Sequence, residues 1–205
     1  MTAVLKSSPN SESLMKLTGK LVTLRPLVAE DAAITLRWRL SKRARFLQRG
    51  AQTEEEQRAW ITAHDRPGEL NYIIEFKGQP VGMTALHDIS QQNKSAVIGR
   101  LLIGEGEKVG SAPVFFEAEL LLCDYAFDQL KLHKIYGHII EDHVGMVRTR
   151  LYFGYKQDGF LRDHYFHDGV YKGAVAVSLL EEEYRTVCRP KLVRLLALLA
   201  IGPAD

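Results

Sequence analysis

The chain has 205 residues, of which 46% are hydrophobic and 25% are charged, the composition of an ordinary water-soluble globular protein. Its 27 basic and 25 acidic residues leave a formal net charge of +2, which excludes the strong positive field of a typical nucleic-acid-binding protein. The two cysteines, Cys123 and Cys188, have no CxxC spacing, and residues 1–16 contain no apolar signal segment. We therefore expect reduced thiols and a cytoplasmic location.

A single folded domain is expected for a chain of this length. We place it at residues 17–184, after a flexible leader of residues 1–16. Residues 185–205 form an apolar helical extension, in which 191–201 reads KLVRLLALLAI. This run is shorter than the about 20 apolar residues that span a bilayer. We expect it to pack on the domain or to form a homodimer contact, in preference to peripheral contact with a membrane.

The first third of the chain predicts one strand and two helices. Alternating apolar residues indicate a strand over residues 17–27, and acidic residues open a helix over residues 30–39. Thr53 and Glu56 form the pattern of a capping box, which begins a second helix that extends to about residue 64.

The loop between these helices, residues 41–50, reads SKRARFLQRG. Phe46 and Leu47 interrupt a run of basic residues. One interpretation is a solvated basic loop. The other is a surface where arginines bind a phosphate and Phe46 stacks on a ring. The residues alone leave both interpretations open.

The remaining elements form a meander followed by alternating helices and strands. In order they are strands over 71–76, 81–89 and 96–103, a helix over 113–130, a strand over 132–141, a helix from a cap at Asp142 or His143 to about 153, and strands over 155–166 and 170–180. Since the meander excludes a regular βαβ alternation, we predict a mixed α/β sheet of the α+β type.

A glycine-containing bend joins the third meander strand to the long apolar helix. Gly104, Gly106 and Gly110 interrupt the strand pattern within seven residues, and Pro113 suits a first helical turn. Such a bend directs free backbone N–H groups to the positive end of a helix, where a phosphate binds. Most glycine bends are only turns, so the spacing by itself is weak evidence.

Several stretches together resemble a known superfamily. The most specific are EAELLLCDYAFDQLKLHKIYGHIIEDH (117–143) and GYKQDGFLRDHYFHDGVYKGAVAVSLLEEEY (154–184). They are similar to the GCN5-related N-acetyltransferase (GNAT) superfamily over nearly all of residues 17–184. Within it, the chain resembles bacterial nucleotide-linked amino-sugar N-acetyltransferases of the pseudaminic-acid type and enzymes that acetylate ribosomal-protein N-termini.

The resemblance implies a central sheet of about seven strands with four flanking helices. It also implies acetyl-CoA as co-substrate and a primary amine as acceptor, most closely the amine of a nucleotide-linked sugar in surface-glycan biosynthesis. The implied cofactor-binding residues are Arg100, Leu101, Leu102 and Ile103 for the pantetheine arm, and Lys108, Val109, Gly110, Ser111 and Ala112 for the pyrophosphate.

The chain departs from the family pattern at the bend and at the catalytic acid. Phe115 or Phe116 stands near the place where a glycine normally lets the backbone approach phosphate. Relatives have an Asn and, seven residues later, a Tyr that acts as the general acid. His143 and Arg150 stand at these two positions here. Tyr152 remains the candidate acid, while Arg150 would stabilise a thiolate by its charge alone.

Candidates for the general base lie at the end of the strand over 132–141 and on the hairpin. They are Glu141 and His143, with His87 and Asp88 beside the acceptor; the alternative roles are helix caps and solvent-exposed side chains. No pair of histidines has a convincing metal spacing, so we predict no metal.

The acceptor would contact the basic loop and the penultimate strand. The implied substrate-binding residues are Arg39, Arg45, Phe46, Arg49 and Tyr165, together with His87 and Asp88. Two alternatives stay open: acetylation of a protein N-terminus or small amine, and a non-catalytic GNAT-like binding module with an altered CoA bend.

Overall fold

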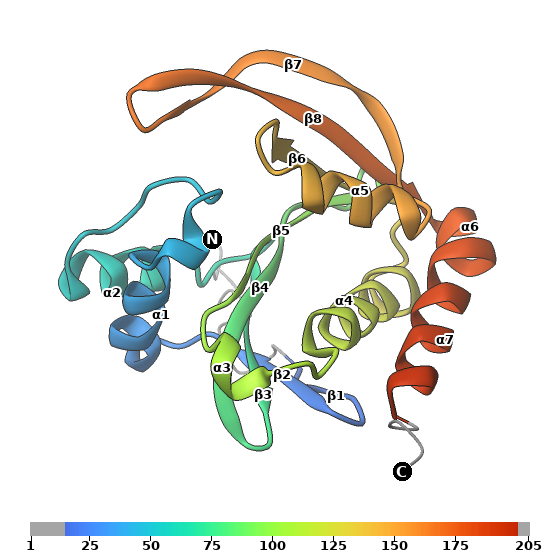
Figure 1. The fold of residues 1–205 in the computed structure, drawn as a ribbon, viewed down its shortest axis with the longest axis horizontal. Helices are drawn as coiled ribbons and strands as arrows, with labels where there is room; N and C mark the ends of the chain where they lie inside the picture. The colour runs from blue at the N-terminus through green and yellow to red at the C-terminus, as the bar shows by residue number, and fades with distance from the viewer. Residues whose placement is uncertain (1–14, 201–205) are drawn as a thin grey trace, which may run out of the picture.

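The computed structural model describes residues 15–200, with the side chain of Ala200 left out. An eight-stranded sheet with the order β1-β2-β3-β4-β5-β6-β8-β7 runs through the domain (Figure 1). The strands are β1 (Leu17–Thr18), β2 (Val22–Pro26), β3 (Leu70–Phe76), β4 (Gln79–Ser90), β5 (Ser95–Ile103), β6 (Lys134–Ile140), β7 (Lys156–His167) and β8 (Val170–Leu180). The α-helices are α1 (Ala32–Arg39), α2 (Glu54–Ala63), α3 (Gly106–Val109), α4 (Val114–Asp124), α5 (Val144–Tyr152), α6 (Glu181–Glu183) and α7 (Arg189–Ala200).

The sheet divides between β5 and β6. Strands β1 to β5 are antiparallel, as are β6, β8 and β7. The two halves join by a parallel pairing of Ser95–Val97 with Lys134–Tyr136, after which β5 and β6 separate (Figure 1). Because the two strands are parallel, their C-terminal ends lie at the same edge of the sheet, and the segments that follow them begin there. The bend after β5 and the start of α5 therefore flank the divergence.

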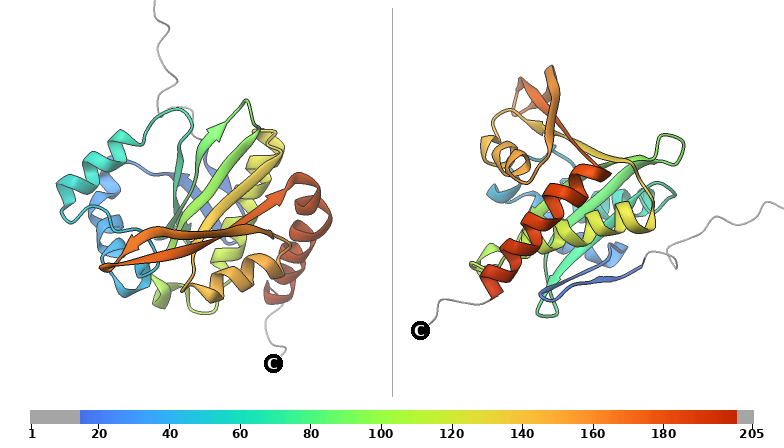
Figure 2. Two further views of the ribbon diagram at one scale, coloured as in Figure 1. Left: turned by 90° about the horizontal axis from the view of Figure 1, so that it is seen from above. Right: turned by 90° about the vertical axis from the view of Figure 1, so that its right-hand side faces the viewer.

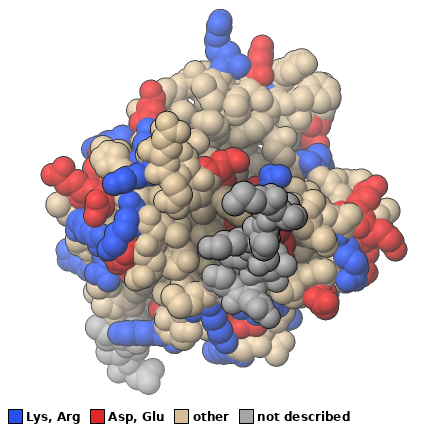
Figure 3. Space-filling view, turned by 180° about the vertical axis from the view of Figure 1, so that it is seen from behind, with Lys and Arg blue, Asp and Glu red and all other residues tan. Residues whose placement is uncertain are grey.

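Helices cover both faces of the sheet (Figure 2). Along β3, Tyr72, Ile74 and Phe76 enter the larger core, on the side of α4 and α7, while Ile73 enters the smaller core beneath α1 and α2. This alternation is the period-two pattern of a strand that is buried on both faces. The surface drawn in Figure 3 shows basic and acidic side chains interspersed, in keeping with the nearly balanced composition.

The predicted fold class is confirmed, with eight strands in place of about seven. The predicted capping box is also confirmed: the Glu56 amide donates to Thr53 Oγ1 at 3.2 Å, and the Thr53 amide donates to Glu56 Oε2 at 3.3 Å. The helix predicted over residues 113–130 is α4 continued by a π-helical turn at Tyr125–Gln129, and α3 is an additional short helix within the bend.

The single strand predicted over residues 17–27 is wrong. It is a hairpin of β1 and β2, and its turn is held by the buried carboxylate of Glu117 on α4. Glu117 accepts the backbone N–H groups of Lys20, Leu21 and Val22 at 3.0, 2.7 and 2.7 Å. These three contacts join residues nearly 100 positions apart, which local sequence patterns do not reveal.

The C-terminal extension packs partly on the domain. Leu192 of α7 is buried in the larger core, whereas Leu198 and Leu199 are exposed. Within residues 15–200, no helix is both long enough and apolar enough to cross a membrane. The homodimer contact stays a prediction. Most of the expected leader, residues 1–14, and residues 201–205 lie outside the described part of the chain.

Candidate functional site

The separation of β5 from β6 frees one backbone edge of β5. Only Ser95–Val97 pair with β6, so among the described residues the edge over 98–103 has no strand partner on that side. An extended ligand with amide groups can bind such an edge as an added strand. The strand predicted to hold the pantetheine arm, Arg100 to Ile103, is this part of β5.

The side chains of this segment point away from the free edge. Leu102 lies in the smaller core, while Leu101 and Ile103 pack against the larger one. Arg100 has a φ of +55° at a break in the β4–β5 register, and its Nη1 donates to Glu69 Oε2 at 2.6 Å. The backbone of the segment is therefore what it can offer to a ligand in the gap, and Arg100 belongs to a polar cluster on the α1–α2 face.

The bend, residues 104–113, already uses most of its amides. The N–H groups of Lys108, Val109, Gly110 and Ala112 donate to carbonyls of the bend itself at 2.9–3.2 Å. Of the five residues predicted to wrap a pyrophosphate, only Ser111 has an amide with no backbone acceptor in the described chain. A phosphate that bound there would compete with these internal bonds, and the predicted wrap stays a prediction.

Helix α1 fixes the start of this bend. The Trp38 indole N–H donates to Glu105 Oε1 at 2.8 Å, and this hydrogen bond, with Arg37 beside it, lowers the pKa of the Glu105 carboxyl. Gly104 lies against the Trp38 ring so closely that a Cβ would stand 2.2 Å from it. Trp38 is buried in the smaller core, and its contacts also orient the bend.

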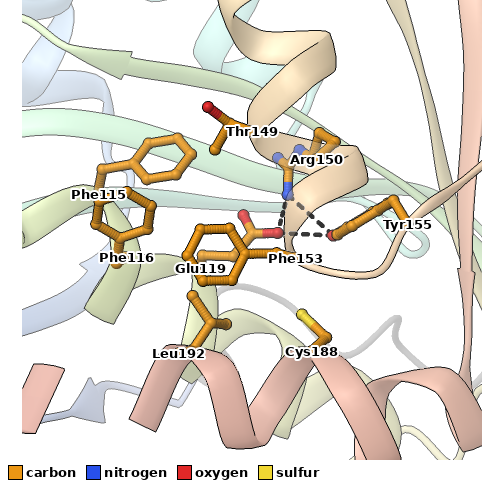
Figure 4. Close-up of a pocket in the computed structure, with 9 residues that line it drawn as sticks. All are labelled: Phe115, Phe116, Glu119, Thr149, Arg150, Phe153, Tyr155, Cys188 and Leu192. Carbon is orange, nitrogen blue, oxygen red and sulfur yellow. Dashed lines mark hydrogen bonds and ion pairs between the residues drawn. The ribbon is translucent and has the colours of Figure 1, made fainter. Parts of the chain in front are cut away.

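Aromatic side chains fill the space between α4 and α5 (Figure 4). Phe115 and Phe116 pack edge to face at 4.9 Å, and Phe116 lies 5.2 Å from Phe153. The cavity left among these rings, α5 and α7 measures about 10 Å³, room for about one water molecule. Phe115 and Phe116 are the two positions of which the sequence expected one to replace the family's glycine.

A buried polar cluster lies beside these rings (Figure 4). Arg150 Nη1 is bonded to Glu119 Oε1 and to Tyr155 Oη, the latter at 2.9 Å, and the Tyr155 hydroxyl donates to Glu119 Oε1 at 2.6 Å. Burial raises the pKa of Tyr155 well above its ordinary value. The sequence proposed Arg150 as a partner of a thiolate; its Nη1 is instead committed to Glu119 and Tyr155, two residues that the sequence did not single out.

Tyr152, the candidate acid, is separate from this cluster. Its side chain is 66% exposed, and Lys191 of α7 lies 4.7 Å from its ring centre. Two positions beyond Arg150 on a helix correspond to a rotation of about 200°, which accounts for the different direction. The structure thus does not bring Tyr152 together with the other candidate residues.

Two base candidates lie at the end of β6. Among residues 15–200 His143 has no ion-pair partner, whereas the Glu141 carboxylate holds a backbone N–H. His143 is the N-cap residue of α5, and its ring stacks on Phe46 at 4.2 Å. Burial and, second, the charge of Arg45 lower the pKa of His143. Glu141 Oε1 accepts the N–H of Gly173 at 2.7 Å and so helps to hold β8.

The hairpin candidates His87 and Asp88 contact each other. His87 Nδ1 lies 2.9 Å from Asp88 Oδ2, and burial and the nearby Arg100 lower the pKa of His87. Since Arg100 also binds Glu69, this pair belongs to the polar cluster on the α1–α2 face.

The basic loop connects α1 with the other half of the sheet. Arg45 lies over the Phe46 ring at 4.5 Å, and Phe46 reaches His143. The Arg45 carbonyl accepts from His167 Nε2 at 2.7 Å, and Arg49 Nη2 donates to Asp168 Oδ1 at 2.7 Å. The loop and the β7–β8 turn therefore meet above the divergence, a contact that the sequence did not predict.

Tyr165 lies on the same hairpin, where its hydroxyl donates to the His138 carbonyl at 3.2 Å. Burial raises the pKa of Tyr165. Among residues 15–200, no group of three or more His, Cys, Asp or Glu side chains is arranged to hold a metal ion.

A model of the acetyltransferase (GNAT) domain matches residues 22–156, more than half of the chain. The chain belongs to the GNAT acetyltransferase family. The expected superfamily is thus confirmed, and the amino-sugar subgroup stays a prediction.

Individual relatives of this GNAT chain include spermidine N(1)-acetyltransferase of Escherichia coli (strain K12). It is 24% identical over 121 residues, which are 59% of this chain and 63% of that protein. The match thus spans less than two-thirds of that relative's length.

Solved structures share the GNAT fold. A GCN5-related N-acetyltransferase from Brucella melitensis superposes with a TM-score of 0.76 at 21% identity, over 93% of this chain and 89% of that one. Spermidine N-acetyltransferase from Vibrio cholerae, in complex with CoA and spermine, superposes with a TM-score of 0.71 at 20% identity, over 82% of this chain and 100% of that one.

Proposed function

We propose that this GNAT domain transfers an acetyl group from acetyl-CoA to a primary amine. The observation that best supports the proposal is the separation of β5 from β6 after Val97, which exposes a backbone edge with the bend and α4 beyond it. The amide-bearing pantetheine arm fits such an edge as an added strand. We place the activity in the cytoplasm, because both cysteines are free.

His143 is our proposed base. A primary amine is protonated at neutral pH and attacks a thioester only after it has lost that proton. The lowered pKa of His143 keeps its imidazole neutral and able to accept a proton, and stacking on Phe46 fixes the ring. Acetyl-CoA supplies the activated acetyl group when it is bound.

For the acceptor, we propose the amine of a nucleotide-linked sugar, as the motifs over 117–143 and 154–184 imply. The exposed arginines Arg45 and Arg49 on the loop above the divergence support this assignment. Phe46 would line the acceptor site next to the proposed base, since its ring stacks on His143. A second candidate is a polyamine, because relatives act on spermidine.

The experiment incubates the purified chain with acetyl-CoA and each of four amines: a UDP-amino sugar, a dTDP-amino sugar, spermidine and a peptide with a free N-terminus. Release of the CoA thiol and the mass of the product are measured. Acetylation of a nucleotide sugar supports the proposal. Exclusive acetylation of spermidine or of the peptide would keep the acetyltransferase activity but refute the nucleotide-linked sugar as the acceptor.

The same assay tests the base with a matched pair of variants. We expect His143→Ala to lower kcat by about 10²- to 10⁴-fold, the usual contribution of a general base. His133→Ala, which removes an exposed histidine elsewhere, serves as the control. If calorimetry shows no binding of CoA or acetyl-CoA at millimolar concentration, the chain is a non-catalytic GNAT-like module.

A further inference from the structure

Arg39 differs from the other arginines in how its charge is balanced. Four arginines of the described chain are partly or fully buried: Arg25, Arg39, Arg100 and Arg150. Three of them have a carboxylate partner, which is Asp31 and Glu75 for Arg25, Glu69 for Arg100, and Glu119 for Arg150. Among residues 15–200, Arg39 is the one shielded arginine without an ion pair.

The surroundings of Arg39 are neutral or positive. Its Nη2 donates to the carbonyl of Gln48 at 2.7 Å, and its guanidinium lies beneath Gly50, at the end of the basic loop. Burial and, second, the charge of Arg100 lower the pKa of Arg39. A shielded guanidinium beside another is unfavourable unless an anion balances it.

The carboxylates of the neighbouring cluster, Glu69 and Asp88, already have partners of their own. Glu69 is 5% exposed and is shared between Arg100, at 2.6 Å, and Arg66, at 3.4 Å. Two guanidinium groups therefore already surround Glu69, while Asp88, the exposed carboxylate of the cluster, contacts His87. Arg39 adds a third guanidinium nearby. Guanidinium groups thus outnumber carboxylates here, which is the charge that an anion-binding site needs.

We infer that Arg39, with Arg100 beside it, binds a negatively charged group, a phosphate or a carboxylate, of the acceptor amine. The inference rests on the proposed function for the assignment of this side of the divergence to the acceptor. The planar guanidinium matches both oxyanions through paired hydrogen bonds. A free polyamine carries only positive charge, so the same cluster disfavours spermidine.

The test compares three small amines that differ in one group: ethanolamine, O-phosphoethanolamine and β-alanine. We expect kcat/KM of the wild-type protein to be at least about tenfold higher for one of the two anionic amines than for ethanolamine, the effect of about 1.4 kcal/mol. The better of the two shows whether phosphate or carboxylate is recognised. Spermidine is assayed in parallel and should be a poor acceptor.

Arg39→Gln should remove most of this preference, lowering kcat/KM for the anionic amine about tenfold more than for ethanolamine. Arg39→Lys, which keeps the charge but loses the fork, should restore part of it. Arg58→Gln on α2, which removes an exposed arginine paired with Glu54, is the matched control. Equal losses for all three amines in Arg39→Gln, or a preference for ethanolamine or spermidine in the wild type, would overturn the inference.

A binding measurement separates this inference from the proposed function. If no amine is acetylated, inorganic phosphate and pyrophosphate are titrated into wild-type protein and Arg39→Gln by calorimetry, after circular dichroism has shown that both are folded. Binding that is lost in Arg39→Gln supports an anion site in a protein that is not an acetyltransferase for these amines. Identical titrations of the two proteins would refute the site whatever the activity.

Discussion

Arg150 of α5 and Glu119 of α4 form an ion pair in the interior, with exposed fractions of only 7% and 4%. The pair joins the two helices on either side of the space that Phe115 and Phe116 occupy (Figure 4). Tyr155 completes it by bonding to both partners. The three side chains thus form a direct polar link between α4 and α5.

Breaking the pair should destabilise the protein strongly. We expect Arg150→Ala to lower the free energy of unfolding by about 3–5 kcal/mol, because it leaves Glu119 buried without its cation. The double variant Glu119→Leu/Arg150→Leu should be within about 2 kcal/mol of wild type. It removes both charges and refills the volume, and the remaining cost is that of the neutral Tyr155 hydroxyl, which loses both partners. Urea denaturation measures both values. A double variant as unstable as Arg150→Ala would show that packing, not charge, governs the effect.

Phe115 should control access to the gap. It lines the small cavity but is not part of either hydrophobic core, whereas Phe116 packs against the larger core. We therefore expect Phe115→Ala to tighten CoA binding by about tenfold, or about 1.4 kcal/mol. Phe116→Ala should instead lower the free energy of unfolding by up to about 3 kcal/mol. Calorimetry with CoA and urea denaturation distinguish the two; unchanged CoA affinity in Phe115→Ala contradicts its role as a barrier.

The pH profile of the reaction should report on His143 and its neighbour Arg45. Since burial and Arg45 both lower the pKa of His143, the neutral imidazole persists below the ordinary histidine range. If His143 is the base, kcat/KM falls at acidic pH as the imidazole gains a proton. Removing the positive charge in Arg45→Ala favours the imidazolium, raises its pKa and moves the acidic limb to higher pH. A limb that stays in place in Arg45→Ala assigns it to another group.

Glu117 should be important for the N-terminal hairpin. Its carboxylate accepts three backbone N–H groups from residues 20–22, and Glu117→Ala leaves them without an acceptor. We expect a loss of about 3 kcal/mol in the free energy of unfolding, because charged hydrogen bonds contribute about 1.5–3 kcal/mol each and are not additive. Glu107→Ala, at an exposed glutamate in the bend, is the control. Faster amide hydrogen exchange confined to β1 and β2 would localise the effect.

Much of the fold follows from interactions between near neighbours, which a sequence displays directly. The Thr53–Glu56 capping box joins residues three apart, and the two-residue alternation of β3 places Ile73 and Ile74 on opposite faces. The glycine bend before α4 and the Gly154 end of α5, with its positive φ, are likewise local features. These patterns were sufficient to predict most of the elements and their order, while the family was expected from the resemblance of residues 117–143 and 154–184.

The sequence named candidate site residues but not which of them would lie in contact. The structure places Arg45, Phe46 and His143 in contact, and their roles stay predictions. Tyr152 does not join them, because two further positions turn a helical side chain to another direction. The assignment of Arg150 rested on its position along α5, and position along a helix does not reveal which partner the side chain meets.

By itself, the sequence determined the periodicities, caps and turns of this GNAT domain, because each is fixed within a few residues along the chain. Only the tertiary structure decided which charges are balanced: Glu117 by a turn 95–97 residues away, Arg150 by Glu119, and Arg39 by no carboxylate in the described chain. The physical reason is that a charge shielded from water must find its partner in space. That partner depends on how the sheet and helices close on one another rather than on spacing along the chain.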